Sequence, residues 1–427
     1  MKKNSLLGII VQFLPLLLLY IFAVLMFSNN ELVHDESRHM DYAVNLTHGY
    51  YTDAVNPELR NGPGYPLVIT PLVLAKAPYM AFRLLNALFL LMAVVFFFKS
   101  LSFYLERKKA LAFSYLFGMY PASLKWMVFI HSESFAIFLA CGFLYYFLKV
   151  HKSTEKKYVN VMLSATFLGI LALTKVLFGY VIITIALFYL MVFAFKRSKK
   201  IRLNLMVLIV GFLFCIPYLG YTYYLTGKTM YWGTGGGEIL YWRSSPFSNE
   251  YGDWINPDVA LGNKEGDYFD TSGIIGNHGD FIQSLEPYSI VQRDSLYKEK
   301  AIGNIKQYPL KFIQNTGVSA LRLFFNYPYS YTQQKMSSFF YILPNIFLTV
   351  FLILSLFLAI RNPMSIPFEI RFIGLTALIF IGGLTLLDGR VRHLLPILPL
   401  LLFFIAFVFK DILDLKLMQG LERSRKI

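Results

Sequence analysis

The sequence predicts an all-α polytopic membrane protein with about ten transmembrane helices, within a range of nine to eleven. Of its 427 residues, 56% are apolar and only 15% are charged, a composition too apolar for a chain that folds in water. Apolar stretches of the length that crosses about 30 Å of hydrocarbon recur from one end of the chain to the other. Basic residues gather between several of these stretches, as expected of loops that stay in the cytoplasm.

The predicted spans follow one another with few long interruptions. The first is too long for the apolar core of a signal peptide, so we expect an uncleaved anchor. The third and the fifth are short, which sets the lower limit of nine. The ten spans are 5–27, 79–101, 110–125, 130–150, 158–174, 176–195, 203–225, 339–360, 368–387 and 394–409.

The distribution of charge orients these spans. With the N-terminus in the cytoplasm, the cytoplasmic segments hold 22 basic and six acidic residues, a net charge of +16, and the rest of the chain carries −1. Loops 105–109, 151–157 and 196–202 and the C-terminal tail are then cytoplasmic, whereas segments 28–78 and 226–338 lie outside. The net charge of +15 therefore reflects insertion and anionic lipid, and we expect no nucleic-acid partner.

This topology divides the chain into three parts. Residues 1–225 form a membrane module of about seven spans, with the external loop 28–78 inside it. Residues 226–338 form a second external loop, and residues 339–427 form three spans and a basic cytoplasmic tail. Each external loop is expected to contain amphipathic helices that lie beside the membrane.

The first external loop is the more regular of the two. Residues 35–48 have the pattern of a short amphipathic helix that ends at Gly49, with Met40, Ala43, Val44 and Leu46 toward the membrane. The apolar stretch 67–75 is too short to span and is expected at the interface.

The second external loop begins with a glycine run at 233–237. A glycine run holds a phosphate only where it opens a helix after a strand, so we predict a flexible loop up to about residue 286. A helical pattern returns between 295 and 325.

Several ionisable residues lie at the outer ends of the predicted spans, where charge is costly and function is the default explanation. Asp35 and Glu36 follow the first span, and Arg38 shares a helix face with Asp35. Asp35 is either an N-cap or the base of an external active site. Glu133 is either a carboxylate favoured by the dipole of its helix or a member of that site.

The cations at the same level have two interpretations as well. Lys175 and Arg83 either snorkel to the interface or bind the phosphate of a lipid-linked ligand. Arg390, Arg392 and His393 lie in an outside turn where the positive-inside rule disfavours cations. They either bind an anionic ligand or form an ion pair with the nearby Asp388.

These residues resemble the motifs of the GT-C superfamily of membrane glycosyltransferases, in particular the bacterial relatives of protein O-mannosyltransferases and lipid A aminoarabinose transferases. The resemblance covers residues 1–225 well and the rest in outline. His39 stands where a tyrosine is common, and the lysine of a Lys-Pro-Pro turn is missing, so Arg60, Lys175 and Arg390 are expected to bind the donor phosphate instead. The matching strings are Asp35-Glu36-Ser37-Arg38, Arg60 to Pro66, Arg83-Leu84, Tyr120-Pro121 with Glu133, Leu173-Thr174-Lys175 and Arg390 to Pro396.

The resemblance implies an inverting glycosyltransferase in the bacterial cytoplasmic membrane, with its active site facing outside. The donor would be a sugar on a polyprenyl phosphate, and the acceptor a hydroxyl of a glycan, lipid or protein. No cofactor is implied with certainty; Asp35, Glu36 and Glu133 have the ligand chemistry for a divalent cation, but no His or Cys spacing supports a metal site. The implied catalytic residues are Asp35 and Glu36. The implied substrate-binding residues are Arg38, Arg60, Tyr65, Arg83, Glu133, Lys175, Arg390, Arg392 and His393.

Two other functions share parts of this pattern. A polymerase or ligase of surface polysaccharide also has about ten spans, a large late external loop and external arginines, but it would not need Asp35. A transporter of lipid or solute would place its charged residues at the middle of the bilayer on broken helices.

Overall fold

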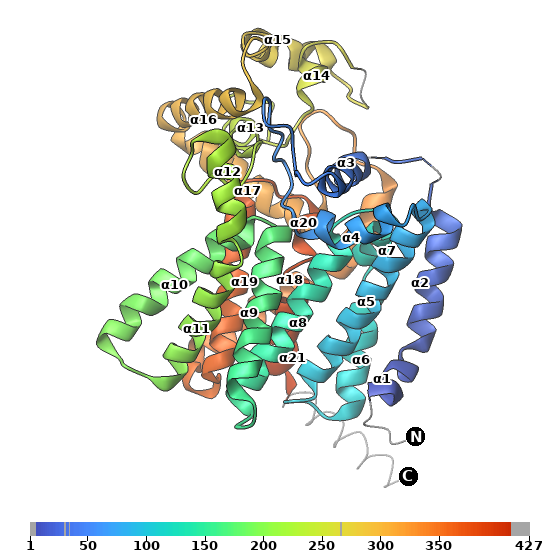
Figure 1. Cartoon of the computed structure of the whole chain (residues 1–427). Helices are drawn as coiled ribbons and strands as arrows, with labels where there is room; N and C mark the ends of the chain where they lie inside the picture. Colours follow the sequence, from blue (N-terminus) through green and yellow to red (C-terminus); the bar gives the residue numbers. More distant parts are fainter. Residues whose placement is uncertain (1–5, 30, 34, 265–266, 411–427) are drawn as a thin grey trace, which may run out of the picture.

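The computed structural model describes residues 6–29, 31–33, 35–264 and 267–410, and within these ranges it is all-helical. The helices form a bundle with a smaller head at one end, and the head is built from α13 to α17 (Figure 1). The predicted all-α class is therefore confirmed. Six basic residues of the expected cytoplasmic termini lie outside the described residues. They are Lys2, Lys3, Lys416, Arg423, Arg425 and Lys426.

Six helices of the described chain are long and apolar enough to cross a membrane, which makes this an integral membrane protein. A seventh span is obtained if α11 (Lys199–Leu213) and α12 (Ile216–Thr226), which are bent by 41° at their break, count as one. All seven agree with predicted spans to within a few residues. The six single helices are α5 (Tyr79–Leu101), α8 (Glu133–Lys152), α9 (Lys157–Thr174), α10 (Leu177–Phe195), α18 (Phe339–Arg361) and α19 (Phe368–Leu386).

The other three predicted spans are interrupted, so the expectation of a single helix at each of them was wrong. Proline explains the breaks, because it lacks the N–H that a helix interior needs. Pro15, Pro121 and Pro399 each occupy the first turn of a new helix. The resulting pairs are α1 (Leu6–Gln12) with α2 (Leu14–Phe27), α6 (Arg107–Gly118) with α7 (Pro121–Met127), and α20 (Val391–Leu394) with α21 (Leu398–Val408).

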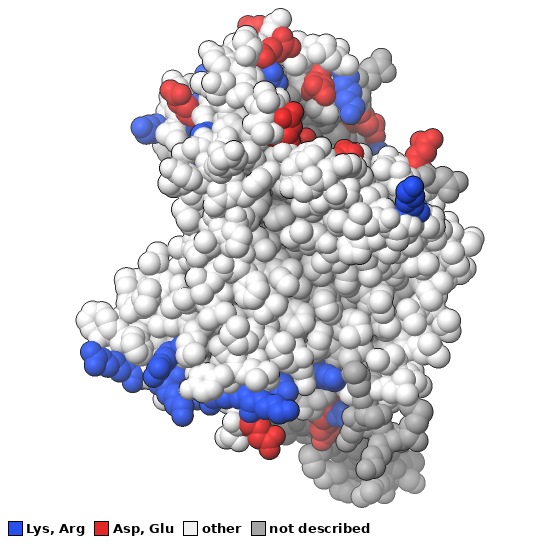
Figure 2. All heavy atoms as spheres, in the orientation of Figure 1, with Lys and Arg blue, Asp and Glu red and all other residues white. Residues whose placement is uncertain are grey.

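Charge separates the two ends of the bundle. Figure 2 shows Lys and Arg gathered along the end opposite the head, which we call the basic end, and most of the visible Asp and Glu on the head. The connection between α8 and α9 contains Lys156, and that between α10 and α11 contains Lys196 and Arg197. The predicted topology depends on an excess of basic residues on one side of the membrane, and the two ends of the bundle differ in that way.

The first loop contains α3 (Glu36–Thr47) and α4 (Gly64–Leu74), as predicted, and Gly49 adopts a left-handed φ of +86° after α3. The buried face of α3 differs from the expected one. Glu36, His39 and Ala43 are buried, whereas Val44 is 40% exposed. The reason is that α3 packs on α4 and its Glu36 pairs with Arg83 of α5, so its inner face contacts protein rather than lipid.

The head has an apolar core of its own, so the predicted flexible loop up to residue 286 was wrong. Aromatic residues of this segment, including Tyr241 and Trp242, form that core together with Tyr297 and Tyr331. The glycine run opens a helix, because Gly235 adopts a φ of +100° directly before α13. The head helices are α13 (Gly236–Arg243), α14 (Pro257–Ala260), α15 (Thr271–Gln283), α16 (Ile290–Gln307) and α17 (Pro309–Phe325).

Candidate functional site

The candidate site is a cavity of about 290 Å³ between the bundle and the head, which we call the amphipathic cavity. One part of its wall is apolar and belongs mainly to α10 and α19. The apolar residues are Val176, Leu177, Ile239, Phe380, Leu384, Leu387 and Pro396. The opposite part is polar and combines segments that are far apart in the sequence. Its residues are Asp35, Arg38, Arg60, Asn61, Lys175, Trp254, Asp388, Arg390, Arg392 and His393.

Positive charge dominates the polar part of the wall. Three segments of the chain supply its basic side chains, whereas Asp35 and Asp388 are its two carboxylates. Arginine and lysine are the side chains that bind phosphate most effectively. The cavity therefore offers a surface for an anionic group directly beside a surface for hydrocarbon.

Asp35 forms ion pairs with two arginines of this wall, and the pair with Arg38 is also a hydrogen bond. Its Oδ1 lies 2.8 Å from a terminal nitrogen of Arg38, and its Oδ2 lies 3.0 Å from one of Arg392. Asp35 stands at the N-cap position of α3, but its side chain makes no capping hydrogen bond, so the capping interpretation was wrong. Burial opposes ionisation of Asp35, yet Arg392 and Arg38 outweigh it and hold the pKa of this carboxyl well below its usual range.

Both arginines are themselves held in place. The Nε of Arg38 donates to the side chain of Asn61 at 2.6 Å, in the turn before α4. The guanidinium of Arg392 lies 5.2 Å from the ring centre of Trp126, and its Nε donates to His393 at 3.3 Å. These contacts fix the two cations in front of Asp35, so the site is organised without a ligand.

The turn around α20 supplies the remaining charges. Arg390 forms an ion pair with Asp388 at 3.2 Å, as one of the two interpretations predicted, and it also lies 5.0 Å from the ring centre of Trp254. His393 approaches the backbone carbonyl of Asp388 with Nδ1 at 3.0 Å. Burial lowers the pKa of His393 to about 4, against the opposing effect of Asp388, so this histidine is neutral at pH 7.

A second cavity, of about 460 Å³, adjoins the first, and we call it the polar cavity. Its wall contains Trp126 and three further aromatic residues, with Lys125 and Lys264. The two cavities share Asp35, Trp254, Arg390 and Arg392. The Asp35 carboxylate therefore lies on the wall that the amphipathic cavity and the polar cavity share.

Lys175 enters the wall from the C-cap of α9, where it donates to Glu133 at 3.0 Å. Its ammonium group is thus bound by protein rather than by interfacial water, which disagrees with the snorkelling interpretation. Two glycines allow the turn before α4 to pack against this helix end. A Cβ on Gly62 would lie 2.0 Å from the Leu173 carbonyl oxygen, and one on Gly64 would lie 2.3 Å from the Thr174 hydroxyl.

The other predicted site residues, the catalytic candidate Glu36 among them, form a layer behind the wall. The Glu36 side chain is fully buried and accepts from the backbone N–H groups of Val33 and Ile130 and from Arg83, at 2.8, 2.6 and 3.2 Å. Arg83 is buried as well, so it does not snorkel. Tyr65 donates to Asn86 at 3.1 Å. None of Glu36, Tyr65, Arg83 and Glu133 lines either cavity.

Two buried histidines belong to the same layer. Burial lowers the pKa of His39 to about 3 and that of His131 to about 4, so both are neutral at pH 7. The Nδ1 of His39, the Nε2 of His131 and the Oε2 of Glu133 have no hydrogen-bond partner among the described residues.

Sequence reasoning missed Trp254 and Asn61, although both line the amphipathic cavity. Trp254 donates to Glu238 at 2.5 Å and lies between Arg60 and Arg390, whose guanidinium carbons are 5.8 and 5.0 Å from its ring centre. No periodicity or charge pattern marks this residue, because its importance arises from the folding of the head onto the bundle.

A divalent cation on Asp35, Glu36 and Glu133 is not supported by this arrangement. Each of the three carboxylates pairs with a different basic side chain: Asp35 with Arg38 and Arg392, Glu36 with Arg83, and Glu133 with Lys175. Among the described residues, no group of three or more His, Cys, Asp or Glu side chains converges in a way that holds a metal ion.

Comparison with known proteins gives a distant structural likeness. No family model matches the chain, and no curated protein matches its sequence. Among solved structures, the crystal structure of ArnT from Cupriavidus metallidurans bound to undecaprenyl phosphate is similar, with 12% sequence identity and a TM-score of 0.41. The alignment covers 94% of this chain and 78% of that one. The likeness assigns neither a family nor a function.

Proposed function

We propose that this membrane protein is an inverting glycosyltransferase, which moves a sugar from a polyprenyl-phosphate donor to an acceptor hydroxyl at the head side of the membrane. The observation that carries the proposal is the position of Asp35. Its carboxylate lies on the wall that the amphipathic cavity and the polar cavity share, and it pairs with two arginines. A base in this position faces a bound donor on one side and an acceptor on the other.

The amphipathic cavity matches the two halves of such a donor. Leu177, Phe380 and Leu384 offer contact for the first part of a prenyl chain. Arg60, Lys175 and Arg390 offer charge-assisted hydrogen bonds to the phosphate beside it. The sugar then points toward the polar cavity, where aromatic rings suit its C–H faces and polar groups suit its hydroxyls.

The chemical step uses Asp35 as the general base. Asp35 takes the proton from the acceptor hydroxyl while the acceptor oxygen forms a bond to the anomeric carbon. The bond between that carbon and the phosphate oxygen breaks, and the lipid phosphate leaves with the electron pair. Attack from the face opposite the leaving group inverts the anomeric configuration, and the cations of the wall stabilise the charge that develops on the phosphate.

The pair formed by Asp35 and Arg392 explains how a weakly basic carboxylate can serve in this step. In the free protein, Arg392 and Arg38 hold the pKa of Asp35 low against the effect of burial. The phosphate gains negative charge as it leaves, and it then competes with Asp35 for the same guanidinium groups. Asp35 therefore becomes more basic at the moment when it receives the proton.

The layer behind the wall has a positioning role in this proposal. The contacts of Glu36 with Arg83 and Ile130 hold the first turn of α3 against the bundle. Glu133 directs the Lys175 ammonium group along the wall. These residues fix the reacting groups without touching the substrate.

The proposed orientation places the site outside the cytoplasm. The basic end of the bundle lies opposite the head (Figure 2), and the excess of basic residues marks the cytoplasmic side. The donor would then be an externally displayed lipid-linked sugar in the bacterial cytoplasmic membrane. An active site facing outside needs no sugar nucleotide.

Transfer by the purified protein tests the proposal. The protein is placed in lipid nanodiscs with radiolabelled polyprenyl-phosphate sugars and with surface glycans, lipids and proteins from cells that lack it. Label is expected to move to one class of acceptor, and the Asp35→Asn protein is expected to move little. Transfer only from polyprenyl diphosphate donors would favour a polymerase or ligase instead, and equal transfer by the Asp35→Asn protein would overturn the proposed mechanism. Mass spectrometry of surface glycans from cells with and without the protein identifies the product.

A further inference from the structure

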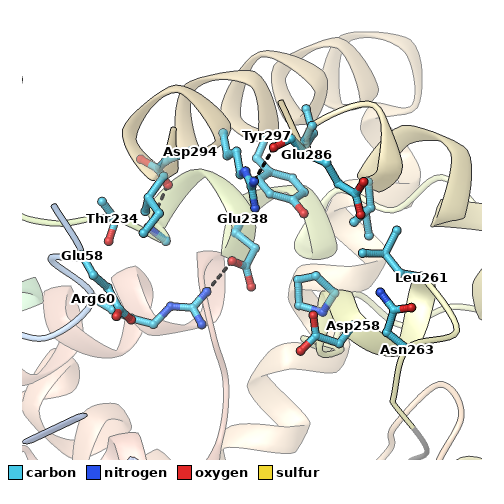
Figure 3. Close-up of a pocket in the computed structure, with 16 residues that line it drawn as sticks. Glu58, Arg60, Thr234, Glu238, Asp258, Leu261, Asn263, Glu286, Asp294 and Tyr297 are labelled. Carbon is cyan, nitrogen blue, oxygen red and sulfur yellow. Dashed lines mark hydrogen bonds and ion pairs between the residues drawn. The ribbon is translucent and has the colours of Figure 1, made fainter. Parts of the chain in front are cut away.

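The head contains a third cavity, of about 480 Å³, which we call the head cavity (Figure 3). It lies among residues of α13, α14, α15 and α16, with Glu58 and Arg60 of the first loop at its edge. Arg60 also lines the amphipathic cavity, and it is the residue that the two cavities share. Asp35 does not line the head cavity.

The hydroxyl of a largely buried tyrosine points into this cavity. Tyr297 is only 5% exposed, and its hydroxyl makes no hydrogen bond to any described residue. Figure 3 shows the phenol directed into the space between Glu238 and Leu261. Because no described residue occupies it, the Tyr297 hydroxyl is available both to donate a hydrogen bond to a ligand and to accept one.

The wall around Tyr297 is preformed. Asp294 accepts from the backbone N–H groups of Gly235 and Gly237 at 2.9 and 2.7 Å and from the Tyr231 hydroxyl at 2.9 Å. Arg293 donates to the carbonyl oxygens of Glu286 and Tyr288 at 2.6 and 2.7 Å. Because these charges are already satisfied by protein, they shape the cavity and do not need a ligand.

Other polar groups of the lining remain available. The carboxylates of Asp258 and Glu286 form no hydrogen bond or ion pair with a described residue, and Glu58 has only a 3.9 Å contact with Arg38. The two cations of the lining are occupied, since Arg60 pairs with Glu238 and Arg293 binds carbonyl oxygens. The free charged groups of the cavity are thus carboxylates, which accept hydrogen bonds and whose negative charge repels an acidic ligand.

We propose that the head cavity binds a saccharide that has no acidic groups. Free carboxylates accept hydrogen bonds from sugar hydroxyls, the Tyr297 hydroxyl adds a group that both donates and accepts, and Leu261, Ile282 and Leu285 contact the C–H faces of sugar rings. The role of this site rests on the proposed function: it holds sugar units of the acceptor glycan that lie beyond the reacting hydroxyl.

Binding of free oligosaccharides tests the inference without any donor. The full-length protein in nanodiscs is titrated by calorimetry with three neutral probes, cellotetraose, maltotetraose and chitotetraose, and with acidic tetragalacturonate. At least one neutral probe is expected to bind, and the acidic one to bind about tenfold more weakly or not at all. Tyr297→Phe removes only the hydroxyl and is expected to weaken neutral binding by about threefold to tenfold. Asp258→Asn removes one negative charge and is expected to reduce the difference in affinity between the neutral and the acidic probes.

The controls separate this site from the transferase site. Asp280→Asn alters an exposed carboxylate of α15 that does not line the cavity, so binding is expected to stay unchanged. Asp35→Asn is expected to bind the neutral probe normally even where transfer is lost. The inference is overturned if none of the neutral probes binds, if acidic and neutral probes bind equally, or if a Tyr297→Phe protein with an unchanged melting temperature binds normally. An inactive protein that binds the neutral probe would overturn the transferase proposal alone.

Discussion

The core of the head and the wall of the amphipathic cavity both contain acidic side chains that are largely removed from water, but they satisfy them differently. In the head, Glu250 accepts hydrogen bonds from His278 at 2.9 Å, Asn277 at 2.8 Å and Tyr331 at 2.7 Å, and from Ser245. At the cavity wall, the Asp35 side chain pairs only with Arg38 and Arg392 among the described residues, and it is 26% exposed. Glu250 faces none of the three cavities, whereas Asp35 faces two.

Glu36 follows the pattern of the head although it is the neighbour of Asp35. Two backbone N–H groups and Arg83 satisfy its carboxylate, and its side chain is not exposed at all. A carboxylate whose oxygens are all hydrogen-bonded to protein donors, which we call saturated, supports the fold. A carboxylate that still has an oxygen facing a cavity, which we call open, is available for chemistry. Adjacent positions in one sequence motif can therefore have opposite roles.

The largest expected effect is the loss of protein stability when a saturated carboxylate is removed. Glu36→Gln leaves the buried Arg83 without its counter-charge, so we expect the free energy of unfolding to fall by about 3–5 kcal/mol. Thermal unfolding of the protein in nanodiscs measures this loss. Glu58→Gln serves as the control, because Glu58 is partly exposed and only weakly paired. A Glu36→Gln protein that is as stable as the control would show that the buried Glu36 carboxylate does not support the fold.

The second effect is the loss of transfer activity when the open carboxylate, Asp35, is removed. Asp35→Asn keeps the shape of the side chain but removes the base, so we expect transfer to slow by roughly 100-fold or more while the melting temperature stays nearly unchanged. The matched control is Asp41→Asn, on an exposed position of the same helix. Near-normal transfer by the Asp35→Asn protein would remove Asp35 from the mechanism.

Lys175 tests whether a cation of the wall serves the fold or the ligand. Lys175→Ala is expected to weaken binding of a polyprenyl phosphate by about 1.5–3 kcal/mol, since a charge-assisted contact is lost. Glu133→Gln keeps an acceptor oxygen for the same ammonium group and is expected to weaken that affinity much less than Lys175→Ala does. Filter binding of the labelled lipid phosphate compares the two proteins. Equal weakening by both substitutions would show that the pair is structural.

The smallest effect is a dependence of stability on pH. The pKa of His131 is about 4 in the folded protein and near 6.5 in an unfolded chain, so the unfolded state binds more protons between these values. Stability is then lost as the pH falls through this window, by about 1–2 kcal/mol from pH 7 to pH 5 for one such histidine. Melting temperatures of the unmodified and His131→Gln proteins at both pH values measure the difference. The slope should be smaller in the variant.

The sequence predicted most of the bundle because its signals are local. Apolar length and basic loops identified seven spans, and the pattern around Asp35 and Gly49 identified α3. The interrupted helices were missed because composition was weighed over a whole window, although Pro15, Pro121 and Pro399 mark the breaks.

The candidate site was predicted in part, for a physical reason. A charged residue at the end of an apolar span is conspicuous, which is how Lys175 and Arg392 were found. Which charges face a cavity and which are saturated depends on contacts between distant segments, such as the hydrogen bond from Ile130 to Glu36. The fold of the head was missed because its packing depends on aromatic residues without a regular period, including Tyr241 and Trp242.

The placement of the tryptophans makes the protein its own optical reporter. Of the four in the chain, Trp126 and Trp254 line the polar cavity, 5.2 and 5.0 Å from the guanidinium groups of Arg392 and Arg390. Trp232 and Trp242 are packed in apolar cores. Indole emission responds to the charge and polarity around the ring, so a ligand that draws either arginine away changes the fluorescence of the first pair. The second pair stays constant and provides an internal reference in the same spectrum.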